Sequence, residues 1–329
     1  MLVACQPGDG QRDGSGVFRV TGASPPDSPW ANQWRRFGEQ LAARDDHGLQ
    51  PEFYVRGQLG DPDQTIHSLR RGRIQLGGFP LSAAAALVPE VAVLHAPFLF
   101  ESEEEVDYLL IHHLQEPLQA LFHAQGVTVV QWTEAGWNHL FADRPLRHPS
   151  DLEGFPMRAQ AGAGSRALLG TVGADVKPLP FSEFVSALQT GLVRGGEATT
   201  VMYLASGLAD EARYLTRTFH AYDAGVILAN SQWWESLGSD RQQALRDALG
   251  PPERLRAEVA SESERLLAEA RAAGRVEVHD LDAAEVEAWR RYGEPMRQRM
   301  ANLIGGDARE ILQILEEGRS GFRVADAGD

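Results

Sequence analysis

Hydrophobic and polar positions alternate between two periods from residue 16 onward. Short segments with strand spacing are separated by longer segments whose apolar residues recur three or four positions apart, as on one face of a helix. Ser28 followed by Pro29 is typical of a helix start, and Gly72 is typical of a helix end. The first predicted elements are a strand at 17–20, a helix from 29 to 41, a strand at 53–55, a helix from 62 to 71 and a strand at 74–79. This order predicts βαβ units.

The alternation continues through the rest of the chain. Two capping-box patterns mark helix starts, Ser102 with Glu105 and Ser239 with Gln242. Pro252 begins a long amphipathic helix that Gly274 ends. The other predicted elements are strands at 127–132, 157–159, around 176 and at 219–229, and helices at 165–172, 182–190, 282–292 and 308–315. Residues 317–329 show no such pattern, so we expect a loose tail.

Length and composition predict a globular protein with more than one core. A chain of 329 residues exceeds what a single hydrophobic core usually organises, so we expect two lobes. Hydrophobic residues make up 43% and charged residues 23% of the chain, and no apolar run approaches the roughly 20 residues that span a bilayer. The formal net charge of −15 argues against nucleic acid as a partner, because phosphate backbones bind clustered Lys and Arg.

The sequence nominates no residues for catalysis or metal binding. Its ten histidines are isolated or, at His112 and His113, adjacent and therefore about 100° apart on a helix, and no HExxH spacing occurs. A nucleophile elbow, a Walker A loop and a GxGxxG segment are also missing from the sequence. We therefore expect no catalytic residue, no metal site and no cofactor.

The single cysteine, Cys5, follows Leu-Val-Ala at the start of the chain. One cysteine excludes an internal disulfide and a cysteine-based zinc site. The segment Leu-Val-Ala-Cys resembles the lipobox of bacterial lipoproteins, in which the cysteine becomes the lipidated first residue. Residues 6–16, QPGDGQRDGSG, are typical of a flexible tether. We expect a periplasmic protein, anchored to the membrane through a lipidated Cys5.

Two segments in the middle of the chain carry a family resemblance. Residues 151–160 read DLEGFPMRAQ and residues 178–200 read PLPFSEFVSALQTGLVRGGEATT. Together they resemble the DctP-type substrate-binding proteins of TRAP (tripartite ATP-independent periplasmic) transporters. Further segments match in the same order, among them APFLF at 96–100 and WTEAGWNHLFADRPL at 132–146. The resemblance covers residues 18 to 315.

The resemblance implies a two-lobed α/β fold like that of periplasmic binding proteins. It predicts an inter-lobe cleft, hinge strands near 127–132 and 219–229, and a long helix that spans both lobes. We assign residues 16–130 and 219–250 to lobe I, and residues 131–218 and 251–316 to lobe II with the spanning helix. Residues 1–15 form the lipobox-like start and tether, and residues 317–329 form the tail.

The resemblance also implies a ligand site in the cleft, with an arginine at the position of Arg158. A guanidinium offers a planar fork that matches a carboxylate and stays charged at physiological pH. Phe181 is expected to form an apolar wall. Two positions depart from the family pattern, Asn138 in place of a common arginine and Ala198 in place of a common asparagine. The side chains expected to re-line the pocket are Trp137, Thr199, Thr200 and Tyr222.

Three functions follow from these observations. The first is an extracytoplasmic receptor that captures a small organic carboxylate and delivers it to the membrane subunits of a TRAP transporter. The second is a receptor that reports its ligand to a membrane sensor. The third is an enzyme on a two-lobed α/β scaffold, for which the histidines are the only support.

Overall fold

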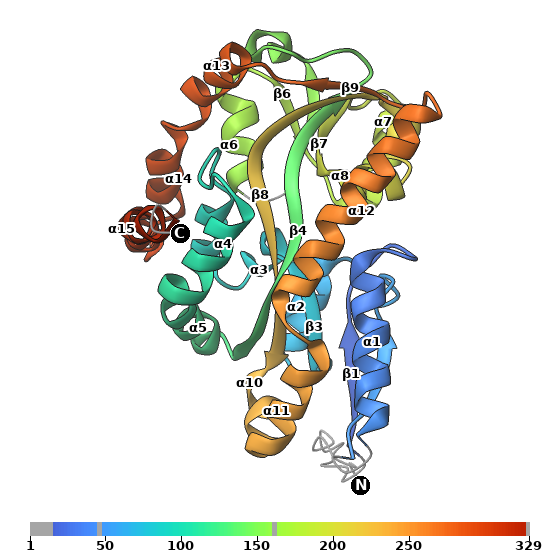
Figure 1. Ribbon diagram of the computed structural model, residues 1–329, viewed down its shortest axis with the longest axis vertical. Coiled ribbons are helices and arrows are strands. Elements are labelled where there is room, and N and C mark those ends of the chain that lie inside the picture. Colours follow the sequence, from blue (N-terminus) through green and yellow to red (C-terminus); the bar gives the residue numbers. More distant parts are fainter. Residues whose placement is uncertain (1–15, 45–47, 160–162, 327–329) are drawn as a thin grey trace, which may run out of the picture.

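The computed structural model describes residues 16–44, 48–159 and 163–326, and its strands form one nine-stranded sheet (Figure 1). The strand order is β2-β1-β3-β8-β4-β7-β5-β6, with β9 beside β8. The strands are β1 Val17–Thr21, β2 Gln50–Tyr54, β3 Leu76–Pro80, β4 Val127–Ala142, β5 Pro156–Ala159, β6 Asp175–Pro178, β7 Gly195–Thr199, β8 Tyr214–Asn230 and β9 Glu277–Asp280.

Helices and short helical turns cover the sheet on both faces. The first group is α1 Pro29–Ala43, α2 Pro62–Arg70, α3 Leu81–Ala84, η2 Pro89–His95, α4 Glu103–Leu109, η3 Leu110–Leu114, α5 Gln115–Ala124, η4 Pro149–Leu152 and α6 Ala163–Thr171. The second group is η5 Phe181–Glu183, α7 Phe184–Gln189, α8 Thr200–Ala205, α9 Leu208–Glu211, α10 Ser231–Ser236, α11 Gly238–Leu249, α12 Pro252–Ala272, α13 Ala283–Gly293, α14 Met296–Ile304 and α15 Ala308–Asp326. The predicted α/β class is confirmed.

Two long strands join two smaller groups of parallel strands. β1 pairs in parallel with β2 and β3, and β5 pairs in parallel with β6 and β7. Between these groups β4 and β8 run antiparallel over their whole length, from Val127 opposite Asn230 to Ala142 opposite Tyr214. The fold is therefore two-lobed, and β4 and β8 are the segments that connect the lobes (Figure 1).

The connecting strands are longer than the sequence pattern indicated. β4 has 16 residues and β8 has 17, whereas strand spacing was visible only at 127–132 and 219–229. The rest of each strand was not recognised because the pairing of β4 with β8 is irregular. It shifts register between Glu134 and Gly136, and Gly136 has a φ of 94°. Such bulges interrupt the two-residue alternation by which a strand is recognised in a sequence.

Helix α12 spans both lobes, as predicted. Its 21 residues extend for about 32 Å at 1.5 Å per residue. Along this length it packs on β4 and also on α1 of the first lobe and α8 of the second (Figure 1). Pro252 occupies its first turn, where a missing N–H costs nothing, and the chain leaves the helix just before Gly274.

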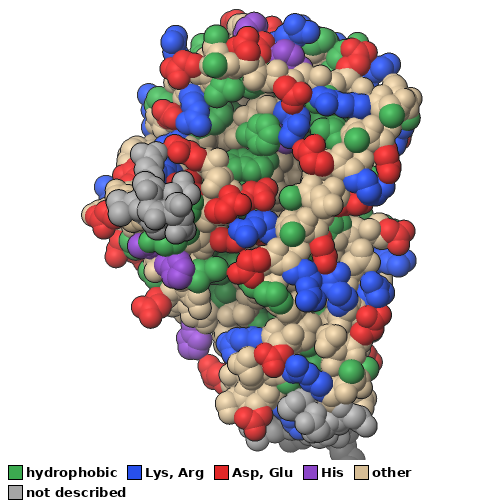
Figure 2. All heavy atoms as spheres, in the orientation of Figure 1, with side chains coloured by type: hydrophobic (Ala, Val, Ile, Leu, Met, Phe, Trp, Pro, Cys, Tyr) green, Lys and Arg blue, Asp and Glu red, His purple; other side chains and the backbone are tan. Residues whose placement is uncertain are grey.

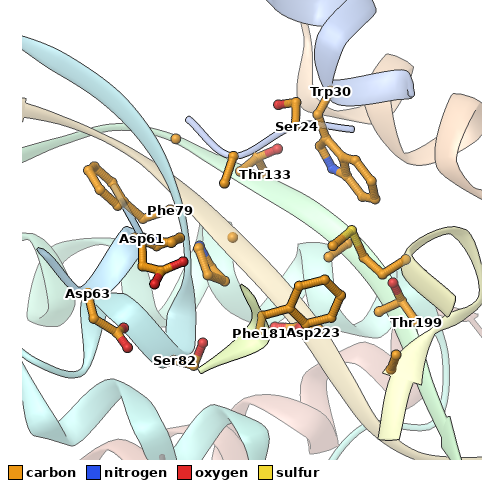
Figure 3. A pocket seen from close by; sticks show the side chains of 18 of the residues that line it. Ser24, Trp30, Asp61, Asp63, Phe79, Ser82, Thr133, Phe181, Thr199 and Asp223 are labelled. Carbon is orange, nitrogen blue, oxygen red and sulfur yellow. The ribbon is translucent and has the colours of Figure 1, made fainter. Parts of the chain in front are cut away.

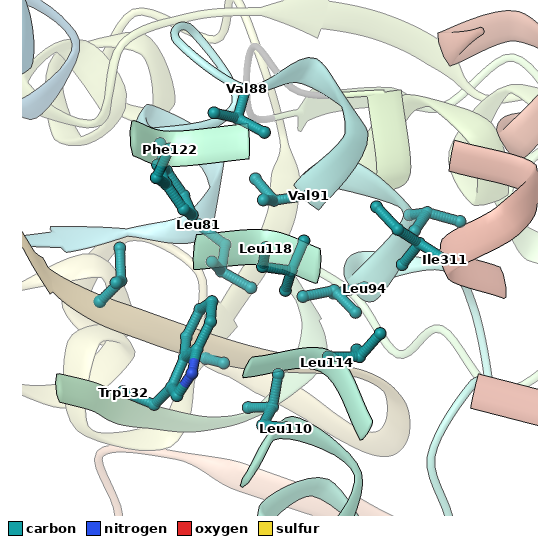
Figure 4. Packing of buried hydrophobic residues seen from close by; sticks show 14 of the residues in the cluster. Leu81, Val88, Val91, Leu94, Leu110, Leu114, Leu118, Phe122, Trp132 and Ile311 are labelled. Atoms are coloured by element: carbon teal, nitrogen blue, oxygen red, sulfur yellow. The ribbon is translucent and has the colours of Figure 1, made fainter. Parts of the chain in front are cut away.

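The last two helices correct one predicted lobe boundary. Residues 251–316 were assigned to lobe II, yet Met300 of α14 and Ile311 and Leu315 of α15 are buried in the largest core, beside residues of lobe I such as Leu94 and Leu110 (Figure 4). An amphipathic pattern shows that a helix has one apolar face, but it does not show which core that face covers. The chain thus returns to lobe I after α13.

Two other local predictions need correction. Residues 317–326 were expected to be loose, but they continue α15 to Asp326. Ser239 was expected to cap a helix, but α11 already begins at Gly238, directly after α10, so Ser239 lies inside its first turn. By contrast, Ser102 caps α4 as predicted, since its Oγ accepts a hydrogen bond of 3.1 Å from the N–H of Glu105.

The face of the protein that carries α12 is mixed in charge. Figure 2 shows acidic and basic side chains interspersed over the face that carries α12. Within the described residues, no helix is both long enough and apolar enough to cross a membrane.

Candidate functional site

A cavity of about 440 Å³ lies between the two lobes, with β4 and β8 along its floor (Figure 3). Lobe I contributes residues from the β1–α1 connection, α1, the start of α2 and the end of β3, among them Ser24, Trp30, Trp34, Asp61, Asp63, Phe79 and Ser82. Lobe II contributes Arg158, the segment 178–182, the end of β7 and Met202. The connecting strands contribute Thr133, Glu134, Ala135, Asn138, Asp223, Gly225 and Ile227.

Arg158 is the only Lys or Arg that lines the cavity among the described residues. It belongs to β5 and is 4% exposed. Its Nε donates a hydrogen bond of 3.0 Å to the carbonyl of Leu179, and its guanidinium lies 5.0 Å from the ring centre of Phe184. Among the described residues, no carboxylate forms an ion pair with it. A buried guanidinium that is not directly paired with a carboxylate is costly, which favours an anionic ligand here.

The surroundings of Arg158 hold its charge at neutral pH. Burial lowers the pKa of Arg158 to about 10, and the nearby carboxylates of Glu197, Asp63 and Asp223 act in the opposite direction. Because this pKa lies well above neutral, the side chain stays protonated and can pair with a carboxylate.

Glu197 links the cavity to a buried histidine. His220 Nε2 lies 2.8 Å from Glu197 Oε2, and both side chains are almost fully inaccessible. On the other side of the ring, His220 Nδ1 lies 2.7 Å from the hydroxyl of Thr218. This chain fixes the orientation of Glu197 behind the arginine.

Glu134 carries a proton on the lobe-connecting strand β4. Burial raises the pKa of Glu134 to about 9, and the neighbouring carboxylate of Asp107 raises it further. The hydroxyl of Tyr222 donates a hydrogen bond to Glu134 Oε2. Asp107 in turn forms an ion pair with Arg256 of α12. At neutral pH the Glu134 carboxyl is therefore neutral, and the group ties β4 and β8 to the spanning helix.

A direct contact crosses the mouth of the cleft. Ser182 in η5 of lobe II donates a hydrogen bond of 3.1 Å to Asp61 Oδ2, at the start of α2 in lobe I. Trp30 of α1 also donates a hydrogen bond of 2.6 Å to the carbonyl of Glu134. The lobes are thus in contact around the cavity, which is the arrangement that excludes water from a bound ligand.

Comparison with known proteins identifies the family. The family model described as "Bacterial extracellular solute-binding protein, family 7", DctP, matches residues 20–303. The chain belongs to this family. It is similar to the C4-dicarboxylate-binding periplasmic protein DctP of Rhodobacter capsulatus, with 27% identity over 294 residues, which is 88% of each chain. Family 7 proteins are solute-binding proteins, so the enzyme hypothesis is not retained.

Solved structures show the same fold. A TRAP periplasmic solute-binding protein from Desulfovibrio salexigens, solved with orotic acid, is 21% identical and has a TM-score of 0.87 over 92% of this chain and 98% of its own. The sugar acid binding protein of Advenella mimigardefordensis, solved with galactonate, is 24% identical and has a TM-score of 0.84 over 92% and 98%. Both likenesses confirm the two-lobed fold.

The cavity of this family 7 protein brings together five of the eight predicted ligand-binding residues. Those five are Arg158, Phe181, Asn138, Ala198 and Thr199. Trp137 does not line it, because Trp137 and Asn138 are neighbours on β4 and their side chains lie on opposite faces of the sheet. Trp137 instead packs against the rings of Phe219 and Tyr222, with centroids 6.0 Å and 5.0 Å away.

Thr200 and Tyr222 are also absent from the cavity wall. Thr200 is buried as the first residue of α8. Tyr222 contacts the site only through Glu134. Trp30, Asp63 and other lobe I residues of the cavity were not predicted as ligand-binding residues. In the sequence they are recognisable only as parts of helix starts. Trp30 and Asp63 lie in the first turns of α1 and α2, directly after loops. This position is the one signal that could have suggested them, since such loops often carry binding residues.

The described part of the chain was expected to hold no metal site. No group of three or more His, Cys, Asp or Glu side chains there could hold a metal ion. His139 is fully buried, which lowers its pKa well below the usual value, and Arg217 lowers it further. Cys5 lies outside the described residues.

Proposed function

We propose that this protein is an extracytoplasmic receptor that binds a small organic carboxylate between its lobes and delivers it to the membrane subunits of a TRAP transporter. The observation that carries the proposal is Arg158, a buried and charged guanidinium that faces an inter-lobe cavity. The bound molecules of the two solved relatives, orotic acid and galactonate, are both carboxylic acids, which supports the same ligand class here.

The chemistry of the anchor suits a carboxylate. A guanidinium and a carboxylate form two parallel charge-assisted hydrogen bonds, and such bonds are stronger in a site that excludes water. The Nε of Arg158 is already engaged with the carbonyl of Leu179, so its outer nitrogens are the ones available to the ligand. Phe184 and Phe181 flank the guanidinium at 5.0 Å and 5.7 Å and restrict its orientation.

Delivery requires that the lobes open and close. The ligand site is shared by side chains from both lobes, and the lobes are connected by β4, β8 and α12. A ligand that contacts both lobes favours the closed arrangement only if it binds that arrangement more tightly. The permease then has two different surfaces to distinguish, one for the loaded and one for the empty receptor.

Membrane anchoring through Cys5 is a separate part of the proposal. It rests on the Leu-Val-Ala-Cys segment and on the tether that follows it. Stable anchoring takes two or more acyl chains, each buried CH₂ contributing about 0.8 kcal/mol. Expression from the natural start should give a lipidated, membrane-associated protein, and Cys5→Ser should release it. A wild-type protein that carries no lipid would exclude the anchor.

Matched ligands test the carboxylate receptor. Calorimetry should compare acids with their primary amides, for example 3-phenylpropanoate with 3-phenylpropanamide and succinate with succinamide. Binding of at least one acid, with loss of binding for its amide, supports the proposal, because only the acid can pair with Arg158. Native mass spectrometry of the purified protein should also show a co-purified acid. Amides that bind as tightly as their acids would refute the proposal.

A further inference from the structure

The described residues of the cavity wall include more acidic than basic side chains. Five carboxyl groups line it, and they face a single guanidinium; the acidic residues are Asp61, Asp63, Glu134, Glu197 and Asp223. Glu134 holds a proton at neutral pH, and Glu197 lies 2.8 Å from His220. This leaves Asp61 and Asp63 as two negative charges against the one positive charge that Arg158 supplies among the described lining residues. Burial and the neighbouring Asp61 raise the pKa of Asp63, as expected where negative charge accumulates.

Buried polar atoms without a hydrogen-bond partner also indicate that the ligand carries a donor. Asn138 Oδ1, Thr133 Oγ1 and Thr199 Oγ1 form no hydrogen bond with any described residue, and all three side chains are at least nine-tenths buried in the cavity wall. Figure 3 shows Thr133 and Thr199. The amide nitrogen of Asn138 is engaged 3.0 Å from His95 Nε2. Its oxygen can only accept, so whatever satisfies it must be a donor.

The lobe I wall adds an aromatic surface beside these acceptors. Trp30, Trp34 and Phe79 line the cavity, and Phe181 faces them from lobe II. Aromatic faces attract cations as well as apolar groups. A cavity of about 440 Å³ also exceeds the space of one carboxylate and leaves room for a second polar group on an apolar body.

We propose that the ligand is a zwitterion, whose carboxylate pairs with Arg158 and whose cationic nitrogen is held by the acidic and aromatic side chains of the same cavity. This inference rests on the proposed carboxylate receptor and specifies its ligand class. A second carboxylate in place of the cationic nitrogen meets Asp61 and Asp63, and no second Lys or Arg lines the described cavity wall to compensate it. A neutral hydroxyl can donate to Asn138 Oδ1, but it leaves the excess negative charge of the wall unbalanced.

Two series of probes, each with one variable substituent, test this on the wild-type protein. The first is 3-phenylpropanoate, 3-phenyllactate, L-phenylalanine and benzylmalonate, in which a hydrogen next to the carboxylate becomes hydroxyl, ammonium or carboxylate. The second is butanoate, 4-hydroxybutanoate, 4-aminobutanoate and glutarate, in which the hydrogen that is replaced is at the end of the chain opposite the carboxylate. Calorimetry should show the ammonium compound tightest in at least one series, by about tenfold or more over the dicarboxylate, where tenfold is 1.4 kcal/mol.

The outcomes separate this inference from the proposed function. If the simple acids or the dicarboxylates bind and the ammonium compounds bind no better, the carboxylate receptor stands and the zwitterion is refuted. Tightest binding by a hydroxy acid also refutes it, in favour of a polyhydroxylated acid. If no member of either series binds at millimolar concentration, the zwitterion is refuted, and the acid sought by native mass spectrometry of the purified protein then decides the receptor.

A variant locates the charge preference. Asp63→Asn removes one negative charge of the wall and keeps the shape of the side chain, so the ratio of affinities between the ammonium compound and its parent acid should fall by about threefold or more. Asp240→Asn is the matched control, because Asp240 also lies in the first turn of a helix but far from the cavity wall. An unchanged ratio in Asp63→Asn, or an equal fall in the control, would contradict the assignment.

Discussion

Replacing Arg158 tests the anchor on which the binding site depends. Arg158→Ala removes the only basic side chain of the described cavity wall. It also removes the hydrogen bond of 3.0 Å to the carbonyl of Leu179 and the stacking on Phe184. The ligand carboxylate is then desolvated in the closed cleft without a partner. We expect the affinity for the ligand to fall far more than the stability of the fold.

The magnitude follows from the burial of the side chain. Truncating one partner of a buried, hydrogen-bonded charge pair costs about 2–5 kcal/mol. Because each 1.4 kcal/mol is tenfold, the dissociation constant of Arg158→Ala should rise by about thirtyfold to several thousandfold. Arg158→Lys keeps the charge but not the planar fork, so most of the loss should remain.

The assay is calorimetric titration with the tightest acid that binds the wild type. Arg194→Ala is the matched control: Arg194 also stacks on an aromatic ring, Phe155, at 5.0 Å, but it is half-exposed and forms its ion pair with Asp143. Its removal should change affinity by less than twofold or so, since exposed ion pairs contribute about 0–1 kcal/mol. Circular dichroism should show folded protein for all variants. If Arg158→Ala binds within a few-fold of wild type, the carboxylate is held elsewhere and the reasoning fails.

Three further predictions concern the lobes, a buried proton and the aromatic wall. Saturating ligand should reduce the radius of gyration measured by small-angle scattering, because contacts such as Ser182 to Asp61 form only when the cleft closes; an unchanged radius would contradict closure. Because burial raises the pKa of Glu134 to about 9, the folded protein keeps a proton that the unfolded chain releases above about 4.5. The free energy of unfolding should therefore fall with rising pH between these values by up to about 1.4 kcal/mol per pH unit, and less steeply in Glu134→Gln; equal slopes in urea denaturation would refute this. Phe181→Ala should weaken calorimetric binding by about tenfold, since an aromatic ring 5.7 Å from the Arg158 guanidinium contributes about 1–2 kcal/mol; no loss would show that Phe181 only packs.

Much of the fold could be predicted from local signals. Ser28 and Pro29 start α1, and the Ser28 hydroxyl accepts a hydrogen bond from the N–H of Ala31, as an N-cap residue does. Pro252 and Gly274 bound the spanning helix within two residues. These signals are reliable because they depend on backbone groups of neighbouring residues, which the sequence displays directly. Arg158 was found in another way, through the resemblance of residues 151–160 to a family segment.

Long-range packing could not be predicted in the same way. The apolar faces of α14 and α15 are visible in the sequence. Which core these faces cover, here that of lobe I, depends on the direction in which the chain leaves α13. On β4, the bulge near Gly136 decides which of Trp137 and Asn138 faces the cavity. One residue of register exchanges the two faces of a strand, and the sequence alone does not fix that register.

The acids around Arg158 have two effects that depend on the same charges. In the empty cleft, Glu197, Asp63 and Asp223 oppose the effect of burial on the Arg158 pKa, so the guanidinium stays protonated and ready to bind. When an acid arrives, those same carboxylates repel any part of it that is negative and not placed on the guanidinium. Removing acids should therefore weaken the selection against additional negative charge. Among the described lining residues there are several carboxylates and one arginine, so we expect a ligand carboxylate to bind at that arginine and a second negative charge to be disfavoured near the acids.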